Sequence, residues 1–277
     1  MTSADSTLRQ ETSDVPRRWL RQTEMSDPGQ AASMLDCLPQ DIAGLCRVVQ
    51  GVLIHLEWIG AYGLSELDPA RFCRDTLSLA DRLSRLAEAG SRPLLVQRPA
   101  GERSAGTCHD FALMLCGLLR HQRIPARVRC GFAAYFREAR WEDHWICEYW
   151  LEAENRWRRV DAQLDDVLVE RLDARFDPTD LPEDAFMTAD TAWRSCRTGR
   201  LDAETFGHGP TCGLWFIRVN VMRDHLVLNG AEVSTWDEWR NVTATHHVLS
   251  HAELQATDAL TRHPTQITSA TAPSWIA

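Results

Sequence analysis

The most constraining feature of the sequence is the block from Arg98 to Asp166, where a loop, a helix and three strands follow one another. The loop RPAGERSAG is rich in Gly, Pro and Ser, and the segment CHDFALMLCGLLRHQ after it has an apolar stripe at helical spacing. Residues 126–136 alternate between apolar and other side chains, which is typical of a half-buried strand. HWICEYWL and RWRRVD indicate two further strands around the turn EAEN. We therefore expect an α+β fold in which a helix packs on an antiparallel sheet, preceded by N-terminal helices.

Cys108 stands where the loop becomes the helix. Thr107 is a natural N-cap, and Asp110 completes an S/T-x-x-D pattern. The free N–H groups and the positive dipole end of a helix lower the pKa of a thiol at its first residue, and the same amides can stabilise an oxyanion. Asp110 opposes this effect, so we expect only a modest lowering of the Cys108 pKa without a histidine partner.

The hairpin of the last two strands nominates that partner. A turn centred between residues 152 and 153 places His144 directly opposite Asp161, and one centred a residue later makes them diagonal neighbours on the same face. In both registers their Cβ atoms lie roughly 5–8 Å apart. A carboxylate there can hold an imidazole in one tautomer while the other ring nitrogen faces a thiol.

The runs GTCHDFALMLCGLLRHQRIPARVRCGF, DHWICEYW and RWRRVDAQLD resemble the core of the transglutaminase-like superfamily, whose fold is papain-like in the broad sense. That resemblance covers about a quarter of the chain. It implies Cys108 as nucleophile, His144 as base and acid, and Asp161 as the orienting carboxylate. His109 departs from the aromatic residue that follows the nucleophile in the animal enzymes, and the absence of their calcium-loop pattern means that calcium dependence is not carried over.

The predicted chemistry is acyl transfer through a thioester. A Cys108 thiolate attacks an amide or ester carbonyl, His144 protonates the leaving group, and an amine or water takes the acyl group. We expect a transglutaminase-like cysteine acyltransferase or an amidase or peptidase that acts on a small-molecule or peptide acyl donor. The sequence leaves open the substrate, the choice between hydrolysis and transfer to an amine, and the oligomeric state. The alternative is a non-catalytic module that binds a substrate or a protein in the same pocket.

Four further residues are candidates for the substrate site. Gln97 and Arg103 precede the nucleophile in the loop and could donate to the oxyanion or bind a substrate carboxylate. His109 is expected to be a pocket or surface residue rather than the base, because adjacent helical residues point about 100° apart. Trp145, beside His144, is a candidate wall of the acyl site or a core residue.

No metal or cofactor is expected. The nine cysteines include no C-x-x-C pair, so a structural zinc site is not predicted. His247 and His251 have the i, i+4 spacing of ligands on one helix face, and a metal-dependent hydrolase is a third hypothesis. Because no H-E-x-x-H motif accompanies them, surface histidines are the favoured interpretation.

The charge and hydropathy patterns exclude several partner classes. A net charge of −9 argues against general nucleic-acid binding and against an anionic membrane surface. There is no apolar run of about 18 residues, so no membrane span is expected. The first residues contain no export signal, and together with the unpaired thiols this favours a cytoplasmic location.

The domain organisation is expected to be simple: a disordered polar segment over 1–30, a single domain over 31–262 and a polar tail over 263–277. Helices are predicted over 41–58 and from Pro69 to a stop at Gly90. A later helix is predicted over 182–199, ended by Gly199, and 213–230 is either strand or buried helix.

Overall fold

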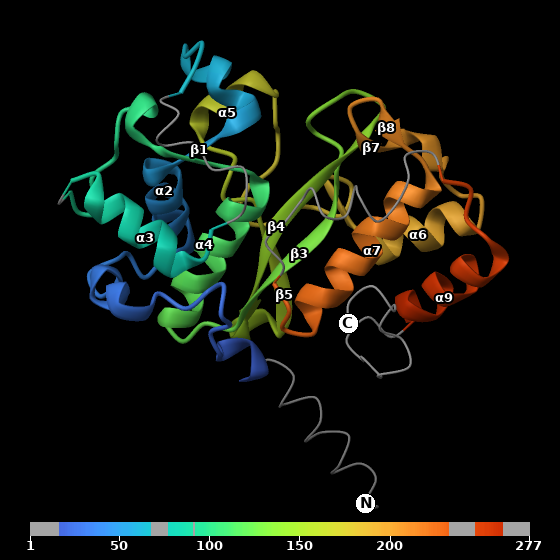
Figure 1. Cartoon of the computed structure of the whole chain (residues 1–277), viewed down its shortest axis with the longest axis horizontal. Helices are drawn as coiled ribbons and strands as arrows, with labels where there is room; N and C mark the ends of the chain where they lie inside the picture. The colour runs from blue at the N-terminus through green and yellow to red at the C-terminus, as the bar shows by residue number, and fades with distance from the viewer. Residues whose placement is uncertain (1–16, 68–76, 91, 233–246, 263–277) are drawn as a thin grey trace, which may run out of the picture.

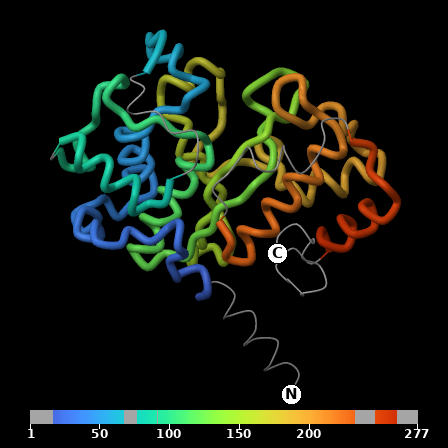
Figure 2. The backbone as a smooth tube through the Cα atoms, viewed as in Figure 1, coloured from blue at the N-terminus to red at the C-terminus, as the bar shows by residue number. Residues whose placement is uncertain are grey.

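The protein is built around a six-stranded sheet with helices on both faces (Figure 1). The structure, a computed structural model, describes residues 17–67, 77–90, 92–232 and 247–262. Helix α4 (Cys108–His121) contacts β3 and β4 from one face, and α7 (Leu214–Leu228) contacts β3 from the other. In Figure 2 the described residues 29–67 and 77–90 lie on the α4 side, and residues 189–232 and 251–262 lie on the α7 side. The α+β prediction, with the Cys108 helix packed on the sheet, is confirmed.

The sheet is antiparallel apart from one short pairing. Its strands are β3 (Ala126–Ala133), β4 (Trp141–Leu151), β5 (Arg156–Val160), β6 (Phe186–Thr188), β7 (Phe206–His208) and β8 (Thr211–Cys212). The spatial order is β6-β3-β4-β7-β8, and β5 also pairs with β4. Among the described strands of this sheet, only β4 and β7 run parallel. A separate two-stranded parallel sheet joins β1 (Leu53–His55) to β2 (Ser104–Gly106).

Strand β4 is open along part of one edge. Its partner β3 occupies one edge from Glu142 to Tyr149. On the other edge β5 takes residues 147–151 and β7 takes residues 141–142, so among the described strands none pairs with residues 143–146 there. His144 lies in this gap, at the point where the sheet divides between β5 and β7.

The helix expected over 41–58 is shorter than predicted. Helix α2 (Ile42–Val52) begins at the N-cap Asp41, whose side chain accepts the Gly44 N–H. It ends where the chain turns into β1 and then into the 3-10 helix η3 (Leu56–Tyr62). The prediction is wrong beyond Val52 because backbone pairing with β2, which lies far away in sequence, overrides the local periodicity.

Helix α3 (Leu79–Glu88) is capped by the side chain of Ser78, which accepts the Asp81 N–H. The predicted start at Pro69 lies outside the described residues. The predicted stop at Gly90 is consistent with the end of α3 two residues earlier, and Gly90 adopts a positive φ of 141°.

Part of the segment predicted to be disordered is folded. Residues 17–20 form the 3-10 helix η1, and residues 29–35 form η2. Trp19 is buried, with its ring 6.4 Å from that of Trp157 and the Arg127 guanidinium nearby. A buried tryptophan removes a large apolar surface from water, and the polar composition of this segment did not indicate that contribution. The prediction of disorder is therefore wrong for residues 17–30. Residues 1–16 and the tail 263–277 lie outside the described residues.

The second helical layer consists of α7 together with α6 (Ala189–Arg197), η7 (Ala203–Thr205) and α9 (His251–Arg262). Helix α5 (Asp166–Arg171) lies on the α4 side instead, against η3 (Figure 1). The helix predicted over 182–199 is only half correct, because residues 186–188 pair with β3 as strand β6. The undecided segment is helix α7, which is buried on nearly every side, and a helix buried all round shows no amphipathic period. No described helix is long and apolar enough to cross a membrane.

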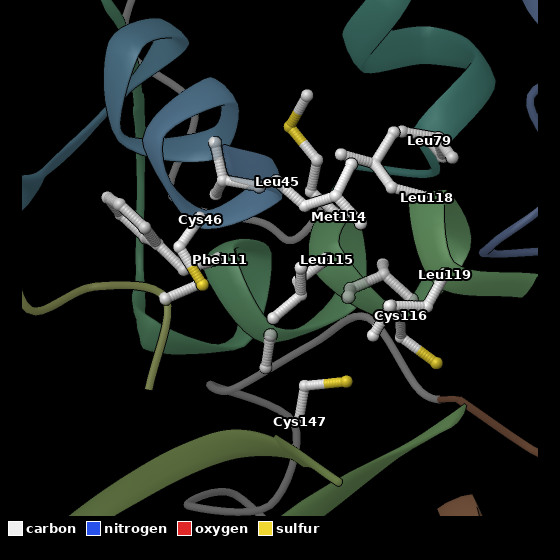
Figure 3. Close-up of a cluster of buried hydrophobic side chains, with 14 of the residues drawn as sticks. Leu45, Cys46, Leu79, Phe111, Met114, Leu115, Cys116, Leu118, Leu119 and Cys147 are labelled. Atoms are coloured by element: carbon white, nitrogen blue, oxygen red, sulfur yellow. The ribbon is translucent and has the colours of Figure 1, made fainter. Parts of the chain in front are cut away.

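Helix α4 is fixed in place by the main core. Figure 3 shows its apolar side chains, among them Leu115 and Leu119, between α2, α3 and the sheet. Cys116 of α4 and Cys147 of β4 are fully buried in this cluster. Because close-packed cores resist displacement, the position of Cys108 at the start of α4 is set by the body of the protein.

Candidate active site

The start of α4 is built by a capping box, as the sequence predicts. The Asp110 carboxylate accepts the Thr107 N–H at 2.7 Å and its hydroxyl at 3.1 Å. Buried Arg82 forms an ion pair with Asp110 and donates to the Ala105 carbonyl at 2.8 Å. The negative charge of Asp110 is thus balanced by a cation that the sequence did not nominate. Arg82 also ties α3 to the strand that leads into Cys108.

His144 and Asp161 form a buried pair, with 2.8 Å between Nε2 and Oδ2. In the observed register Cys147 pairs with Val160, which continues to Ile146 opposite Asp161. Of the two registers considered, the structure therefore has the diagonal one. Because Nε2 is hydrogen-bonded to the carboxylate, Nδ1 is the ring nitrogen that can exchange a proton with a reacting group.

Tyr135 is a member of this constellation that the sequence did not reveal. Its hydroxyl donates to Asp161 Oδ2 at 2.6 Å, and the Gln163 N–H donates to Oδ1 at 2.9 Å. Burial raises the pKa of Asp161, but His144 and Tyr135 outweigh it and hold that pKa below its ordinary value. Burial and Asp161 raise the pKa of Tyr135, so its hydroxyl keeps its proton and remains a donor. Strand alternation could not place it, because β3 ends at Ala133 and Tyr135 lies in the following turn.

A cavity of about 420 Å³ opens at the gap in β4, and Cys108 and His144 both line it. One wall is aromatic: the Phe136 ring lies 4.8 Å from the His144 ring and 5.7 Å from that of Trp58. The remaining lining residues are His55, Leu56, Glu57, Thr107, Arg137, Glu142, Asp143, Gln163, His208 and Gly209.

Residues from distant parts of the chain meet at the mouth of the cavity. Glu57 of η3 and His208 of β7 approach to 3.3 Å, and this hydrogen bond raises the pKa of His208. Deeper in the cavity, neither side-chain polar atom of the buried Gln163 has a hydrogen-bond partner among the described residues. The site thus combines a thiol, an imidazole held by a carboxylate, an apolar wall and a side-chain amide that lines the same cavity.

The Cys108 thiol is half-buried, and its surroundings favour the neutral form. Burial raises its pKa well above the ordinary value, with Asp143 and Asp161 adding to the effect, while a hydrogen bond from the Trp145 backbone lowers it. The expectation that the helix start lowers this pKa is therefore wrong, because burial outweighs the dipole. In such surroundings a thiolate is favoured only when a base takes the proton, because the resulting ion pair carries no net charge.

Residues 90–162 match the family model of the transglutaminase-like superfamily. The matched segment contains Cys108, His144 and Asp161. This segment is similar to the core of that superfamily. No curated protein matches the chain. A candidate cysteine protease from Cytophaga hutchinsonii is a structural neighbour with 17% identity and a TM-score of 0.33, over 53% of this chain and 41% of that one. The chain therefore spans less than half the length of this neighbour, and a likeness of this extent carries no argument about function.

Gln97 and Arg103 do not line the cavity that contains Cys108 and His144. They line a second cavity, of about 380 Å³, on the side of Asp161 that faces Asp165. Arg103 donates from Nε to the Arg98 carbonyl at 3.1 Å, and its Nη1 lies 3.7 Å from Asp165 Oδ2. These contacts hold it away from Cys108, so the structure does not bring either residue to the acyl site.

His109 and Trp145 pack against each other in the interior of the protein. Both are buried, and their rings stack at 4.1 Å between centroids with 19° between planes. Burial, aided by Arg223, lowers the pKa of His109 to about 3. Neither side chain lines the cavity. The expectation of a pocket or surface position for His109 is wrong because Trp145 covers its ring, and Trp145 reaches the site only through its backbone.

The C-terminal histidines do not share a helix face. Helix α9 begins at His251, and His247 precedes it with Nε2 3.2 Å from Glu253. Among the residues that the structure describes, no group of three or more His, Cys, Asp or Glu side chains is arranged to hold a metal ion.

Proposed function

We propose that this protein is a cysteine-dependent acyl-transfer enzyme that uses Cys108, His144 and Asp161 to form a thioester from an amide or ester. One observation carries the proposal: a buried histidine, held by a carboxylate at 2.8 Å, lines the same cavity as a half-buried thiol at a helix start. The match to the transglutaminase-like superfamily over residues 90–162 supports a cysteine-enzyme fold.

The proposed reaction begins with a proton transfer. Nδ1 of His144 takes the proton from the Cys108 sulfur, and the thiolate attacks the carbonyl carbon of the acyl donor. The tetrahedral intermediate collapses when the bond to the leaving nitrogen or oxygen breaks and Nδ1 returns the proton to that atom. An amine or water, deprotonated by Nδ1, then attacks the thioester and releases the acyl group and the thiol. Asp161 stays ionised throughout and stabilises the imidazolium.

The alternative is a binding module that retains the pocket without turnover. The buried His144–Asp161 pair argues against it. Burying a charged carboxylate lowers the stability of the fold, and a binding module without turnover has no need for that carboxylate to orient an imidazole. The half-buried nucleophile facing an open cavity also favours catalysis. The acceptor, water or amine, follows from the substrate and is decided by product analysis.

The test is acylation of the full chain by p-nitrophenyl acetate, followed by peptide mapping. We expect an acetyl thioester on Cys108 that decays in water and faster with added hydroxylamine. Cys108→Ala should abolish it, and His144→Ala should slow its formation by about 10²-fold or more. The matched control is Cys37→Ala, which removes an exposed thiol that does not line the cavity. Acetylation of Cys37 with Cys108 spared would contradict the enzyme and favour the binding module.

A further inference from the structure

His55 reaches the candidate active site from an element outside the matched core. Strand β1 ends at His55 and pairs in parallel with β2, with His55 opposite Gly106. Gly106 precedes Cys108 by two residues, so this register places His55 beside the entry to the nucleophile helix. The His55 ring lies 6.4 Å from that of Phe111 in the first turn of α4. His55 lines the cavity with Cys108 and His144, although it is only 8% exposed.

The hydrogen bonding of His55 fixes where its proton lies. Nδ1 accepts the backbone N–H of Glu57 at 3.2 Å, and a ring nitrogen that accepts cannot also carry a proton. The neutral ring therefore has its hydrogen on Nε2. Burial lowers the pKa of His55 to about 4, with His144 adding to the effect and Glu57, Asp110 and Asp161 opposing it. At neutral pH the ring is uncharged, and the described residues offer Nε2 no partner.

We propose that His55 is a catalytic residue whose Nε2–H donates to the carbonyl oxygen of the acyl donor. This inference rests on the proposed function, because the oxygen gains negative charge only when Cys108 attacks the carbonyl carbon. The hydrogen bond moves no proton: Nε2 keeps its hydrogen while the C=O electron pair shifts to the oxygen and returns when the leaving group departs. A neutral, pre-oriented N–H donor stabilises such an oxyanion without the reorganisation that water would need.

A purely structural role makes a different prediction. As the N-cap of η3, His55 uses only Nδ1, and its loss would loosen the segment and disturb every reaction of Cys108 equally. An oxyanion donor is specific, because it affects only reactions in which negative charge develops on oxygen. Two reagents that attack the same sulfur separate the two roles.

The experiment compares acylation of Cys108 by p-nitrophenyl acetate with its alkylation by iodoacetamide, in the full chain at pH 7. Acylation passes through a tetrahedral oxyanion, whereas alkylation is a displacement at saturated carbon and forms none. We expect His55→Phe to slow acylation by about 10²–10³-fold, the range seen when one oxyanion donor is removed. Alkylation should stay within about a factor of three, and His55→Gln, which keeps an N–H donor, should recover part of the acylation rate.

His121→Phe is the matched control, because it removes a histidine at the far end of α4, where Nε2 lies 3.2 Å from Asp36. It should change neither rate. If His55→Phe does not fold, His55→Leu removes the same donor with less volume. Equal loss of both rates, or no loss of acylation, would overturn the role of His55. A wild-type Cys108 that neither reagent modifies would instead overturn the proposed function itself.

Discussion

The Asp161 carboxylate accepts hydrogen bonds on both oxygens, and its donors come from three different places. His144 lies on the neighbouring strand and Tyr135 lies in the turn after β3. The third donor is the backbone N–H of Gln163, two residues further along the chain. A carboxylate held from three sides cannot rotate, so it fixes the plane and tautomer of the imidazole. The orientation of His144 is therefore set by Asp161 and by the two other groups that hold its carboxylate.

Tyr135→Phe tests this arrangement at the scale of one atom. Losing a hydrogen bond to a charged acceptor costs about 1.5–3 kcal/mol, and we expect turnover or Cys108 acylation to fall about 10-fold with folding preserved. Tyr135 helps hold the pKa of Asp161 down, so the variant should raise that pKa. Asp161 then takes up a proton at a higher pH, and the acid limb of the pH–rate profile should move to higher pH.

Tyr62→Phe is the control, because Tyr62 donates to Asp165 at 2.9 Å in an equivalent pair outside the acyl cavity. An unshifted acid limb in Tyr135→Phe, with acylation at the wild-type rate, would mean that Tyr135 does not position Asp161.

At the scale of elements, the site depends on how closely β3 and β6 approach. Gly131 of β3 pairs with His144 on one side and with Thr188 of β6 on the other. A Cβ at Gly131 would collide with the Met187 carbonyl oxygen and would lie 2.7 Å from the Phe186 ring. Since backbone atoms cannot yield cheaply, β6 would have to leave β3.

We expect Gly131→Ala to lower the free energy of unfolding by about 1–3 kcal/mol, as overpacking does in well-packed cores. Urea unfolding followed by tryptophan fluorescence measures this change. Gly60→Ala is the control, since its Cβ would meet nothing within 4 Å, and it should stay within about 0.5 kcal/mol. Equal stability of both variants would show that β6 can shift without cost.

The elements also show what the sequence could and could not predict. The start of α4 at Cys108 and the shared face of His144 and Asp161 follow from local rules, namely capping and strand alternation. Strand β1 could not be predicted, because its three residues continue a helical apolar pattern and become a strand only by pairing with β2. His55 and Tyr135 were missed for this reason: each reaches the site through a long-range contact that leaves no spacing in the sequence.

Across the whole molecule, a buried charge network joins the sheet to the second helical layer. Arg129 of β3 donates to Asp224 of α7 at 2.8 Å and to Glu148 of β4 at 3.0 Å. Burial raises the pKa of Glu148, but Arg129, Arg127 and Arg159 outweigh it and lower that pKa to about 2. Arg129 therefore links α7 to the sheet, and this link depends on the ionisation of Asp224 and Glu148.

Ionised Glu148 should stabilise the folded protein, so its protonation at low pH should lower the free energy of unfolding. Its folded pKa of about 2 lies below its ordinary value of 4.5, so its stabilisation is present above 4.5 and is lost as pH falls toward 2. We expect the free energy of unfolding in urea to fall between pH 5 and pH 3, and Glu148→Gln to reduce that slope. The variant should also be less stable at pH 7 by about 3–5 kcal/mol, because its arginine partners lose their counter-charge.

Glu170→Gln, on the exposed side of α5, makes the same change of charge without touching the network and should keep the wild-type slope. A wild-type slope in Glu148→Gln as well would exclude Glu148 as a source of acid sensitivity.

The gap in β4 has a consequence for how such a protein can diversify. The proposed reacting groups come from residues 108–161, but η3 and β7 also contribute residues to the lining of the cavity. Changes at Trp58 or His208 would therefore reshape what enters while the reaction stays the same. Two relatives that catalyse the same reaction could therefore act on different substrates. The sequence differences responsible would lie in the flanking segments rather than in the shared core.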